Sequence, residues 1–309
     1  MKDKKIGFIG QGWIGKHYAD DFVNRGFNNV VRYSLEEPYL ENGEKIKDCE
    51  IVFIAVPTPT TVKGFDGSIL RQAVKKVGQG KIAVIKSTLL PGTIEEIQKE
   101  NPGIFVLHSP EFLSEVRAAY DAAHPNRNII GIPKMNDEYK KKAEEVLAVL
   151  PLAPYKLICR ADEAELIKYG GNCWFYFKII FINLLYDLAQ KSGLNYEVIK
   201  EAMAADPRIG SSHLRAVHDT KDEIHNGQLN FNDFHLEPRH KSGRGAGGHC
   251  FIKDFAAFTE FYRKQIGDEA GIKVLESLKD KNIDLLVKSN KDLDLLAGVY
   301  GEEVLKDNQ

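Results

Sequence analysis

The sequence predicts an α/β fold: a doubly wound, Rossmann-type parallel sheet followed by an all-helical domain with one long helix. Up to about residue 158, short apolar runs alternate with amphipathic stretches, which is the pattern of βαβ units whose sheet is covered on both faces. A glycine-rich turn at residues 10–15 joins the first apolar run to a helical stretch. After Arg160 the pattern becomes helical, and Asp162 to about Gly193 is consistent with a single helix.

The first domain, residues 1–158, is expected to bind a dinucleotide. Its expected strands are Ile6–Ile9, Val30–Tyr33, Ile51–Val56, Ile82–Lys86, Ile104–Leu107 and Asn128–Ile132. Helices are expected near residues 14–25, 68–77, 93–100 and 136–149. Because short apolar runs separated by helices are typical of parallel sheets, we expect these strands to be parallel.

The second domain, residues 159–309, is expected to be helical and to mediate dimerisation. Another helix begins near Asn195, and residues 252–300 have helical periodicity with Gly267 and Gly271 as breakers. A polar insert at about 211–242 has no usable periodicity and is longer than ordinary loops. Its histidines are irregularly spaced, so we expect surface histidines there and no metal site.

Composition excludes several classes of protein. The 42 Lys and Arg residues against 44 Asp and Glu leave a net charge of −2, so there is no basic footprint for nucleic acid or a membrane. Four cysteines are scattered without a C-x-x-C pair, which suits a reducing compartment.

The chain enters an apolar strand at Ile6, which leaves no room for a signal peptide. Polar residues interrupt the apolar stretch 173–189, which therefore predicts a buried helix. We expect a cytoplasmic protein.

The turn Gly10-Gln-Gly12-Trp13-Ile14-Gly15 indicates a dinucleotide site. The first glycine permits the tight turn, the second lets a pyrophosphate approach the backbone, and the third lets helix pack on strand. The helix N-terminus then offers N–H groups to the phosphate.

The cofactor's ribose position departs from the usual pattern. The second strand should end in an acid, but Ser34 stands there, with Glu36 as a possible substitute. No arginine follows the strand to bind a 2′-phosphate, and Arg32 should alternate to the other face. NAD is favoured over NADP, which is not excluded.

Three polar segments follow expected strands, at the edge where open α/β sheets bind ligands. They are Val56-Pro57-Thr58-Pro59, Lys86 to Thr93 with Thr88 near its start, and Ser109 to Glu115. The last brings two carboxylates, Glu111 and Glu115, to this edge. Taken singly, each acid is also consistent with a solvated loop residue.

The long helix carries Lys168 and Asn172 four residues apart, so both project from one face. Glu165 lies one turn before Lys168 and is placed to pair with it in a surface salt bridge. Gly170 and Gly171 each cost the helix roughly 1 kcal/mol relative to alanine. We therefore expect something to pack closely against the backbone there.

A glycine-rich loop, Gly243 to Gly248, ends near Cys250, where a helix begins. A helix N-terminus stabilises a thiolate. Asp254 lies one turn further on. The other cysteines, Cys49, Cys159 and Cys173, are expected to be buried and inert.

Together these segments resemble the UDP-glucose/GDP-mannose dehydrogenase family across about residues 5–260. The resemblance rests, in order, on the glycine turn, VPTP, KST-x-x-PGT, SPEFL-x-E, E-x-I-K-Y-x-x-N, DPRIG (Asp206 to Gly210) and GG-x-CF-x-KD. It implies oxidation of a sugar primary alcohol to the carboxylate with two NAD, through a covalent stage.

The resemblance also implies residue roles. Cys250 attacks the aldehyde, Lys168 and Asn172 stabilise oxyanions, Asp254 and Thr88 hold a water, and Glu111 assists thioester hydrolysis. Arg208 reaches the substrate of a neighbouring subunit, with the long helix as dimer core. Further cofactor contacts are implied for Gly10, Gly12, Trp13, Ile14, Gly15, Ser34, Val56, Pro57, Thr58 and Glu115. Further substrate contacts are implied for Phe112, Leu113, Gly247 and Phe251.

The sequence departs from the family pattern at three points. The chain ends at Gln309, before the family's further nucleotide-binding domain, the insert is longer, and Ile252 replaces a proline. Two other functions therefore stay open. One is a one-step β-hydroxyacid-type dehydrogenase, and the other is a non-catalytic dinucleotide-binding dimer.

Overall fold

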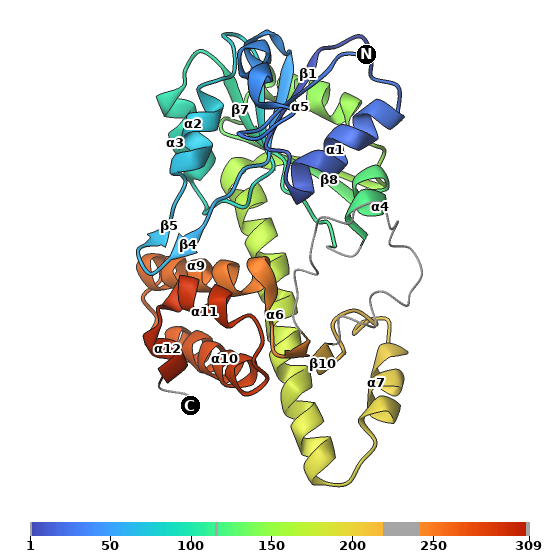
Figure 1. Cartoon of the computed structure of the whole chain (residues 1–309), viewed down its shortest axis with the longest axis vertical. Coiled ribbons are helices and arrows are strands. Elements are labelled where there is room, and N and C mark those ends of the chain that lie inside the picture. Colours follow the sequence, from blue (N-terminus) through green and yellow to red (C-terminus); the bar gives the residue numbers. More distant parts are fainter. Residues whose placement is uncertain (1, 115–116, 219–241, 307–309) are drawn as a thin grey trace. The chain divides into compact units, whose positions relative to one another are not determined.

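The computed structural model describes residues 2–114, 117–218 and 242–306 (Figure 1). The chain forms two compact units. Unit 1 comprises the residues up to Pro59 together with Phe65–Lys168, and unit 2 comprises Thr60–Gly64 and the residues from Tyr169 onward. A short hairpin, β4 (Thr60–Thr61) with β5 (Gly64–Phe65), lies where the chain passes between them.

Unit 1 contains a seven-stranded sheet in the order β2-β1-β3-β6-β7-β8-β9. The strands are β1 (Ile6–Ile9), β2 (Val30–Tyr33), β3 (Ile51–Ile54), β6 (Ile82–Ile85), β7 (Phe105–His108), β8 (Arg127–Ile132) and β9 (Tyr155–Arg160). The predicted α/β class is confirmed, and the six expected strands are present within a few residues of their expected bounds.

Two features of the sheet differ from expectation. Strand β8 runs antiparallel to β7, with His108 opposite Gly131, although all other neighbours are parallel. An antiparallel neighbour needs no long crossover helix, and only the short α4 lies between these two strands. Strand β9 was not predicted. It is one of the two edge strands and is largely exposed, so it lacks the apolar run of the central strands.

Helices cover both faces of the sheet. They are α1 (Trp13–Asn24), α2 (Ser68–Val74), α3 (Thr93–Glu100), α4 (Ala118–Ala123) and α5 (Asp137–Val149), with a 3₁₀ helix at Leu40–Asp48. On one face Phe8 stacks on Phe53 and meets Phe22 edge to face. On the other face Ile9 and Ile54 belong to a second core cluster. Burial on both faces explains why β1, β3 and β6 are continuous apolar runs.

Unit 2 is mainly helical. Its elements are α6 (Ala161–Lys191), which begins in unit 1, then α7 (Tyr196–Ala204), β10 (Val217–His218), β11 (Gly243–Arg244), α9 (Gly248–Gln265), α10 (Glu269–Lys288), α11 (Leu293–Tyr300) and α12 (Glu303–Lys306). Tyr176 of α6 stacks on Phe255 of α9, with ring centroids 3.9 Å apart, in the core of this unit.

The breakers near residue 270 act differently from one another. Gly267 has a φ of +67° and lies between α9 and α10. The expectation for Gly271 was wrong, because it lies in the first turn of α10, where its N–H donates to the capping carboxylate of Asp268 at 2.7 Å. Among the described residues, no helix is long and apolar enough to span a bilayer.

Candidate active site

The glycine turn before α1 has a geometry that fits a pyrophosphate. A Cβ on Gly10 (φ +88°) would lie 2.2 Å from the carbonyl oxygen of Ala55, and one on Gly15 would lie 1.9 Å from that of Gly10. In contrast, a Cβ on Gly12 would meet no atom within 4 Å. Gly12 caps α1 without a side-chain acceptor, and a phosphate at this helix N-terminus would be stabilised by the backbone N–H groups and the helix dipole.

This difference between the glycines makes a testable pair. Gly12→Ala is expected to keep the free energy of unfolding within about 1 kcal/mol of the native value. The same change should weaken NAD binding at least tenfold, about 1.4 kcal/mol, because the methyl group enters the space where the pyrophosphate approaches. Gly15→Ala should instead destabilise the protein by about 1–3 kcal/mol through overpacking. Thermal unfolding with and without NAD measures both effects, and equal stability of the two variants would contradict the assignment.

The ribose end of the dinucleotide site favours NAD. The guanidinium of Arg32 pairs with Asp20 on α1, with Nη1 and Oδ1 2.6 Å apart. The hydroxyl of Ser34 donates to the carbonyl of Glu36 at 2.7 Å. Arg32 is thus held against α1 by a carboxylate, and an engaged guanidinium is a poor receptor for a 2′-phosphate.

The segments after β3 and β6 are tied together at the carboxyl edge of the sheet. The hydroxyl of Ser87 donates to the carbonyl of Val56 and accepts from its N–H, at 2.7 and 3.1 Å. Thr58 donates to the carbonyl of Thr88 at 2.8 Å. Pro57 lies between the two bonded residues. Glu115, predicted to contact the cofactor, lies outside the described residues.

Glu111 and Lys168 form a buried ion pair within unit 1. Their Oε1 and Nζ atoms are 2.7 Å apart, and both side chains are at least nine-tenths buried. The second carboxylate oxygen accepts from the N–H of Leu113 at 2.7 Å, and the Lys168 ammonium lies 5.7 Å from the ring centre of Phe112. Glu111 is therefore no solvated loop acid. Burying both charges carries a desolvation cost that a surface pair avoids.

Glu165 does not form the expected salt bridge with Lys168. Its carboxylate instead accepts hydrogen bonds from the N–H groups of Gly92 and Ile94, at 2.7 and 2.8 Å. It thus caps α3 and ties the loop after β6 to α6. Burial raises the pKa of Glu165 to about 8, although the two backbone hydrogen bonds oppose the shift.

This raised pKa predicts a pH-dependent stability. Between the ordinary pKa of 4.5 and the folded value of about 8, the folded chain binds the proton more tightly than the unfolded chain. The free energy of unfolding should therefore fall as the pH rises through this window, by up to about 1.4 kcal/mol per unit. Glu165→Gln should flatten that slope, whereas Glu163→Gln, in the same first turns of α6 but exposed, should retain it. Urea titrations from pH 5 to 8 measure the slope, and equal slopes in native protein and Glu165→Gln would refute the prediction.

Sequence analysis missed Lys86 as a buried amine near this pair. Its Nζ donates to the hydroxyl of Ser109 at 3.1 Å and lies 4.2 Å from the ring centre of Tyr18. Burial lowers the pKa of Lys86 to about 7. The charge of Glu111 opposes this shift, and the like charge of Lys168 adds to it. A lysine directly after the apolar run Ile82–Ile85 was the available signal, because the end of a buried strand is itself often buried.

In unit 2, Asp254 is fully buried and engaged on both oxygens. Asn172 donates to Oδ2 at 2.6 Å, and the ammonium of Lys253 lies 2.5 Å from Oδ1. Asn172 and Asp254 come from α6 and α9. Unit 2 thus brings together two of the predicted catalytic side chains.

Cys250 differs from the other three cysteines in its exposure. It is the third residue of α9 and is half-buried, whereas Cys49, Cys159 and Cys173 are buried. Burial raises the pKa of Cys49 and of Cys159 to about 11, and that of Cys173 further still. These three thiols are suited to packing and not to nucleophilic attack.

The remaining substrate predictions lie on unit 2. Gly247 caps α9, and Phe251 packs partly against the core cluster of this unit. The Arg208 side chain is 87% exposed and pairs with Asp206 at 2.7 Å. The insert is described only at residues 211–218 and 242, so most of it lies outside the described residues.

Close packing at Gly170 and Gly171 does not come from the described part of this chain. A Cβ on either glycine would meet no atom within 4 Å among the described residues. Neither glycine is therefore required by a close approach of another described segment to the helix backbone.

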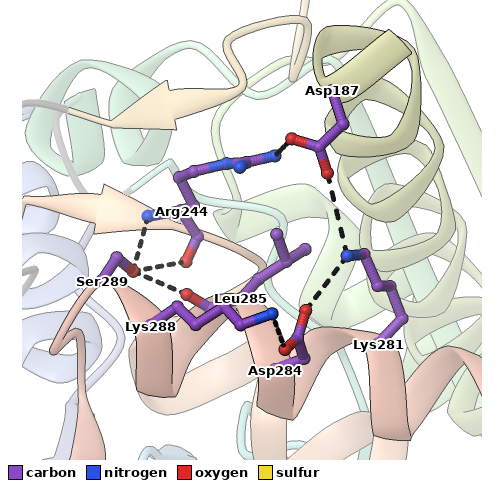
Figure 2. Close-up of a pocket in the computed structure, with 7 residues that line it drawn as sticks. All are labelled: Asp187, Arg244, Lys281, Asp284, Leu285, Lys288 and Ser289. Carbon is purple, nitrogen blue, oxygen red and sulfur yellow. Dashed lines mark hydrogen bonds and ion pairs between the residues drawn. The ribbon is translucent and has the colours of Figure 1, made fainter. Parts of the chain in front are cut away.

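A cavity of about 320 Å³ lies in unit 2 but contains none of the predicted site residues (Figure 2). It is lined by Asp187, Arg244, Lys281, Asp284, Leu285, Lys288 and Ser289. Arg244 pairs with Asp187 at 2.7 Å, and Lys288 pairs with Asp284 at 2.6 Å. Lys281 lies 3.8 Å from Asp187 and 3.1 Å from Asp284. All three cations of the lining are thus ion-paired with its two carboxylates, and the cavity is lined by a salt-bridge network.

Comparison with known proteins places the chain in a family. Residues 23–150 match the sequence model of the UDP-glucose/GDP-mannose dehydrogenase family's NAD binding domain, and residues 162–219 match that of its central domain. The matches together cover more than half of the chain. The first model supports NAD as the cofactor of unit 1.

One curated relative and two solved structures illustrate the likeness. The UDP-glucose 6-dehydrogenase YwqF of Bacillus subtilis is 29% identical over 94% of this chain and 64% of its own. A UDP-glucose dehydrogenase from Pyrobaculum islandicum has a TM-score of 0.71 at 25% identity, covering 92% of this chain and 69% of that one. A Mycobacterium tuberculosis 3-hydroxyisobutyrate dehydrogenase has a TM-score of 0.64 at 15% identity, covering 96% and 98%, and shows the fold alone.

The chain spans 37% to 64% of the length of the first curated relatives that it matches. The residues matched by the two family models include VPTP, the KST segment, SPEFL, the Lys168–Asn172 stretch and DPRIG. The fold is that of a Rossmann-type sheet followed by a helical unit. On these grounds the chain belongs to the UDP-glucose/GDP-mannose dehydrogenase family.

Proposed function

We propose that this protein oxidises the primary alcohol of a sugar, and specifically of a nucleotide sugar, to the carboxylate with two NAD, in the manner of a UDP-glucose 6-dehydrogenase. The observation that carries the proposal is the setting of Cys250, the one half-buried thiol of the four, at the start of α9. A one-step dehydrogenase has no use for such a nucleophile. Family membership and the paired polar groups of each unit support the same reaction.

In the proposed reaction, two molecules of NAD, held in turn at the glycine turn before α1, would supply the hydride acceptor for two successive oxidations. The first oxidation converts the alcohol to an aldehyde, and the Cys250 thiolate then adds to the carbonyl carbon to form a thiohemiacetal. The second converts this adduct to a thioester on Cys250. Water hydrolyses the thioester, which releases the carboxylate and regenerates the thiol.

The two polar pairs have distinct tasks in this scheme. The Lys168 ammonium stabilises the oxyanions that develop at the reacting carbon, with Asn172 as a hydrogen-bond donor. The buried position of Lys168 strengthens this effect, because the surrounding dielectric is low. Asp254 and Thr88 hold the water that takes part in proton transfer, and Glu111 assists hydrolysis.

We further propose that two copies associate through α6. Trp174, Phe181, Leu184 and Leu188 are between 49% and 65% exposed, and their spacing of seven, three and four residues places them on one face of the helix. An exposed apolar stripe of this kind marks an interaction surface. In the dimer, the exposed Arg208 contributes to the neighbouring subunit's substrate site.

A charge placed in the stripe should dissociate the dimer. Phe181→Glu is expected to yield monomers at low micromolar concentration, because pairing would bury an uncompensated carboxylate. Val274→Glu, at an equally exposed apolar position on α10, is the matched control and should remain dimeric. Sedimentation velocity measures the mass, and a native protein that is monomeric would overturn the assignment.

The reaction is tested by counting reduced cofactors. UDP-sugars, GDP-sugars and sugars without a nucleotide are each incubated with NAD or NADP, and the moles of reduced cofactor per mole of substrate consumed are measured. Two per substrate supports the proposal, and one supports the β-hydroxyacid-type alternative. Cofactor binding without turnover of any of these substrates would support the non-catalytic alternative.

A further inference from the structure

The glycine-rich loop 243–248 is held by side chains from α10 and the turn that follows it, and three of the four are buried. The Asn282 side chain, 2% exposed, binds both backbone groups of Ala246. Its Oδ1 accepts from the N–H of Ala246 at 2.7 Å, and its Nδ2 donates to the carbonyl at 3.0 Å. The Asn282 amide thus forms hydrogen bonds with both the N–H and the carbonyl of Ala246, as a residue of a neighbouring β-strand would.

Three further side chains complete this loop support, which we define as Asn282, Ser289, Lys291 and Asp292. Ser289 accepts from the N–H of Arg244 at 2.9 Å, and Lys291 donates to the carbonyl of Gly245 at 3.2 Å. Asp292 accepts from the N–H of Gly248, the first residue of α9, at 2.8 Å. The loop backbone is therefore bonded to the support at four of its six residues.

The loop support also explains why the loop is rich in glycine. A Cβ on Gly245 would lie 2.9 Å from Oδ1 of Asn282, and one on Gly247 would lie 2.1 Å from Oδ2 of Asp292. Gly245 has a φ of +89°, which a residue with a side chain rarely adopts. The glycines at these two positions let the support reach the backbone.

We propose that Asn282 is a positioning residue for Cys250, acting through the loop that leads into α9. The inference rests on the proposed function, since it takes Cys250 as the nucleophile. Cys250 stands two residues beyond Gly248 in the first turn of α9, so its thiolate is stabilised by N–H groups whose direction the loop sets. Asn282 is uncharged, so its removal changes this geometry without changing the charge near the thiol.

The test measures the thiol directly, without substrate. Asn282→Leu keeps the side-chain volume and removes both hydrogen bonds to Ala246, together with the contact to the Tyr176 hydroxyl. Ser277→Ala, an exposed change on the same helix, is the control. Iodoacetamide alkylation from pH 5 to 10 is followed by mass spectrometry, with Cys250→Ala giving the background of the three buried thiols. The midpoint of the alkylation profile should rise by roughly half a unit in Asn282→Leu and stay native in Ser277→Ala.

Turnover supplies the second readout. Asn282→Leu should lower kcat by roughly tenfold to 100-fold, as a small displacement of a reacting group does, with KM for NAD within twofold of native. The inference would be overturned if Asn282→Leu had the alkylation midpoint of the native protein and a kcat within twofold of the native value. Should Asn282→Leu not fold, Asn282→Ala is judged by the same criteria. Should the native protein oxidise no sugar, the proposed function fails, and the alkylation midpoint alone decides whether Asn282 positions Cys250.

Discussion

Replacing Cys250 with alanine is expected to stop the reaction after the first oxidation and leave the fold intact. The thiol is half-buried at the start of a helix, so its loss removes little packing. Without it no thiohemiacetal forms, and carboxylate production should fall by roughly 10³-fold or more, as is typical when a covalent nucleophile is removed. The yield should drop from two reduced cofactors per substrate to at most one.

Cys159→Ala is the matched control, because this thiol lies in the sheet of unit 1 and is buried. It is expected to cost some stability and to leave the stoichiometry at two. Rapid quenching and mass spectrometry of native protein and Cys250→Ser should find a substrate adduct on the native protein alone. Two reduced cofactors per substrate from Cys250→Ala at the native rate would exclude the covalent mechanism.

Replacing Lys168 with methionine is expected to damage both stability and catalysis. The change removes the ion-pair partner of the buried Glu111 carboxylate, and breaking a buried pair in this way costs about 3–5 kcal/mol. Urea unfolding measures this loss. Turnover should fall by at least about 100-fold, the effect of removing one oxyanion-stabilising group.

A double variant separates the two effects. Adding Glu111→Leu to Lys168→Met replaces the ion pair by apolar side chains of similar volume, which is often neutral or stabilising. The double variant should therefore regain most of the lost stability and remain inactive. If the free energy of unfolding of Lys168→Met lies within about 1 kcal/mol of the native value, the Glu111–Lys168 pair contributes no more than a solvent-exposed ion pair. The proposed electrostatic role of the pair would then be wrong.

The sequence predicts most of the sheet, because strands buried on both faces leave a visible signature. Ile51–Ile54 and Ile82–Ile85 are continuous apolar runs with every residue buried. The edge strand Tyr155–Arg160 carries no such signature, since most of its side chains reach solvent. The antiparallel direction of β8 is likewise a property of tertiary arrangement, which local periodicity does not record.

The sequence predicts which residues belong to the candidate site better than it predicts which of them contact one another. Glu111 and Lys168 were both singled out, but nothing in their spacing pairs them across 57 residues. The spacing allows Glu165 to pair with Lys168 on its own helix, whereas the structure gives it two backbone N–H groups at the start of α3. A carboxylate accepts from any donor that the fold brings near. No sequence motif marks Asn282, because a single buried amide within a helix creates no recognisable spacing or periodicity.

Helix α6 passes from one compact unit into the other between Lys168 and Tyr169. A fragment ending at Lys168 would keep the dinucleotide turn and the carboxylate–ammonium pair yet lack Cys250, and the complementary fragment would contain Cys250 without either of them. Under the proposed function, neither half is an enzyme. Lys168 and Asn172 are separated by about 6 Å of helical rise. If two mixed fragments recovered activity, they would therefore have reassembled the turn of α6 that joins Lys168 to Asn172.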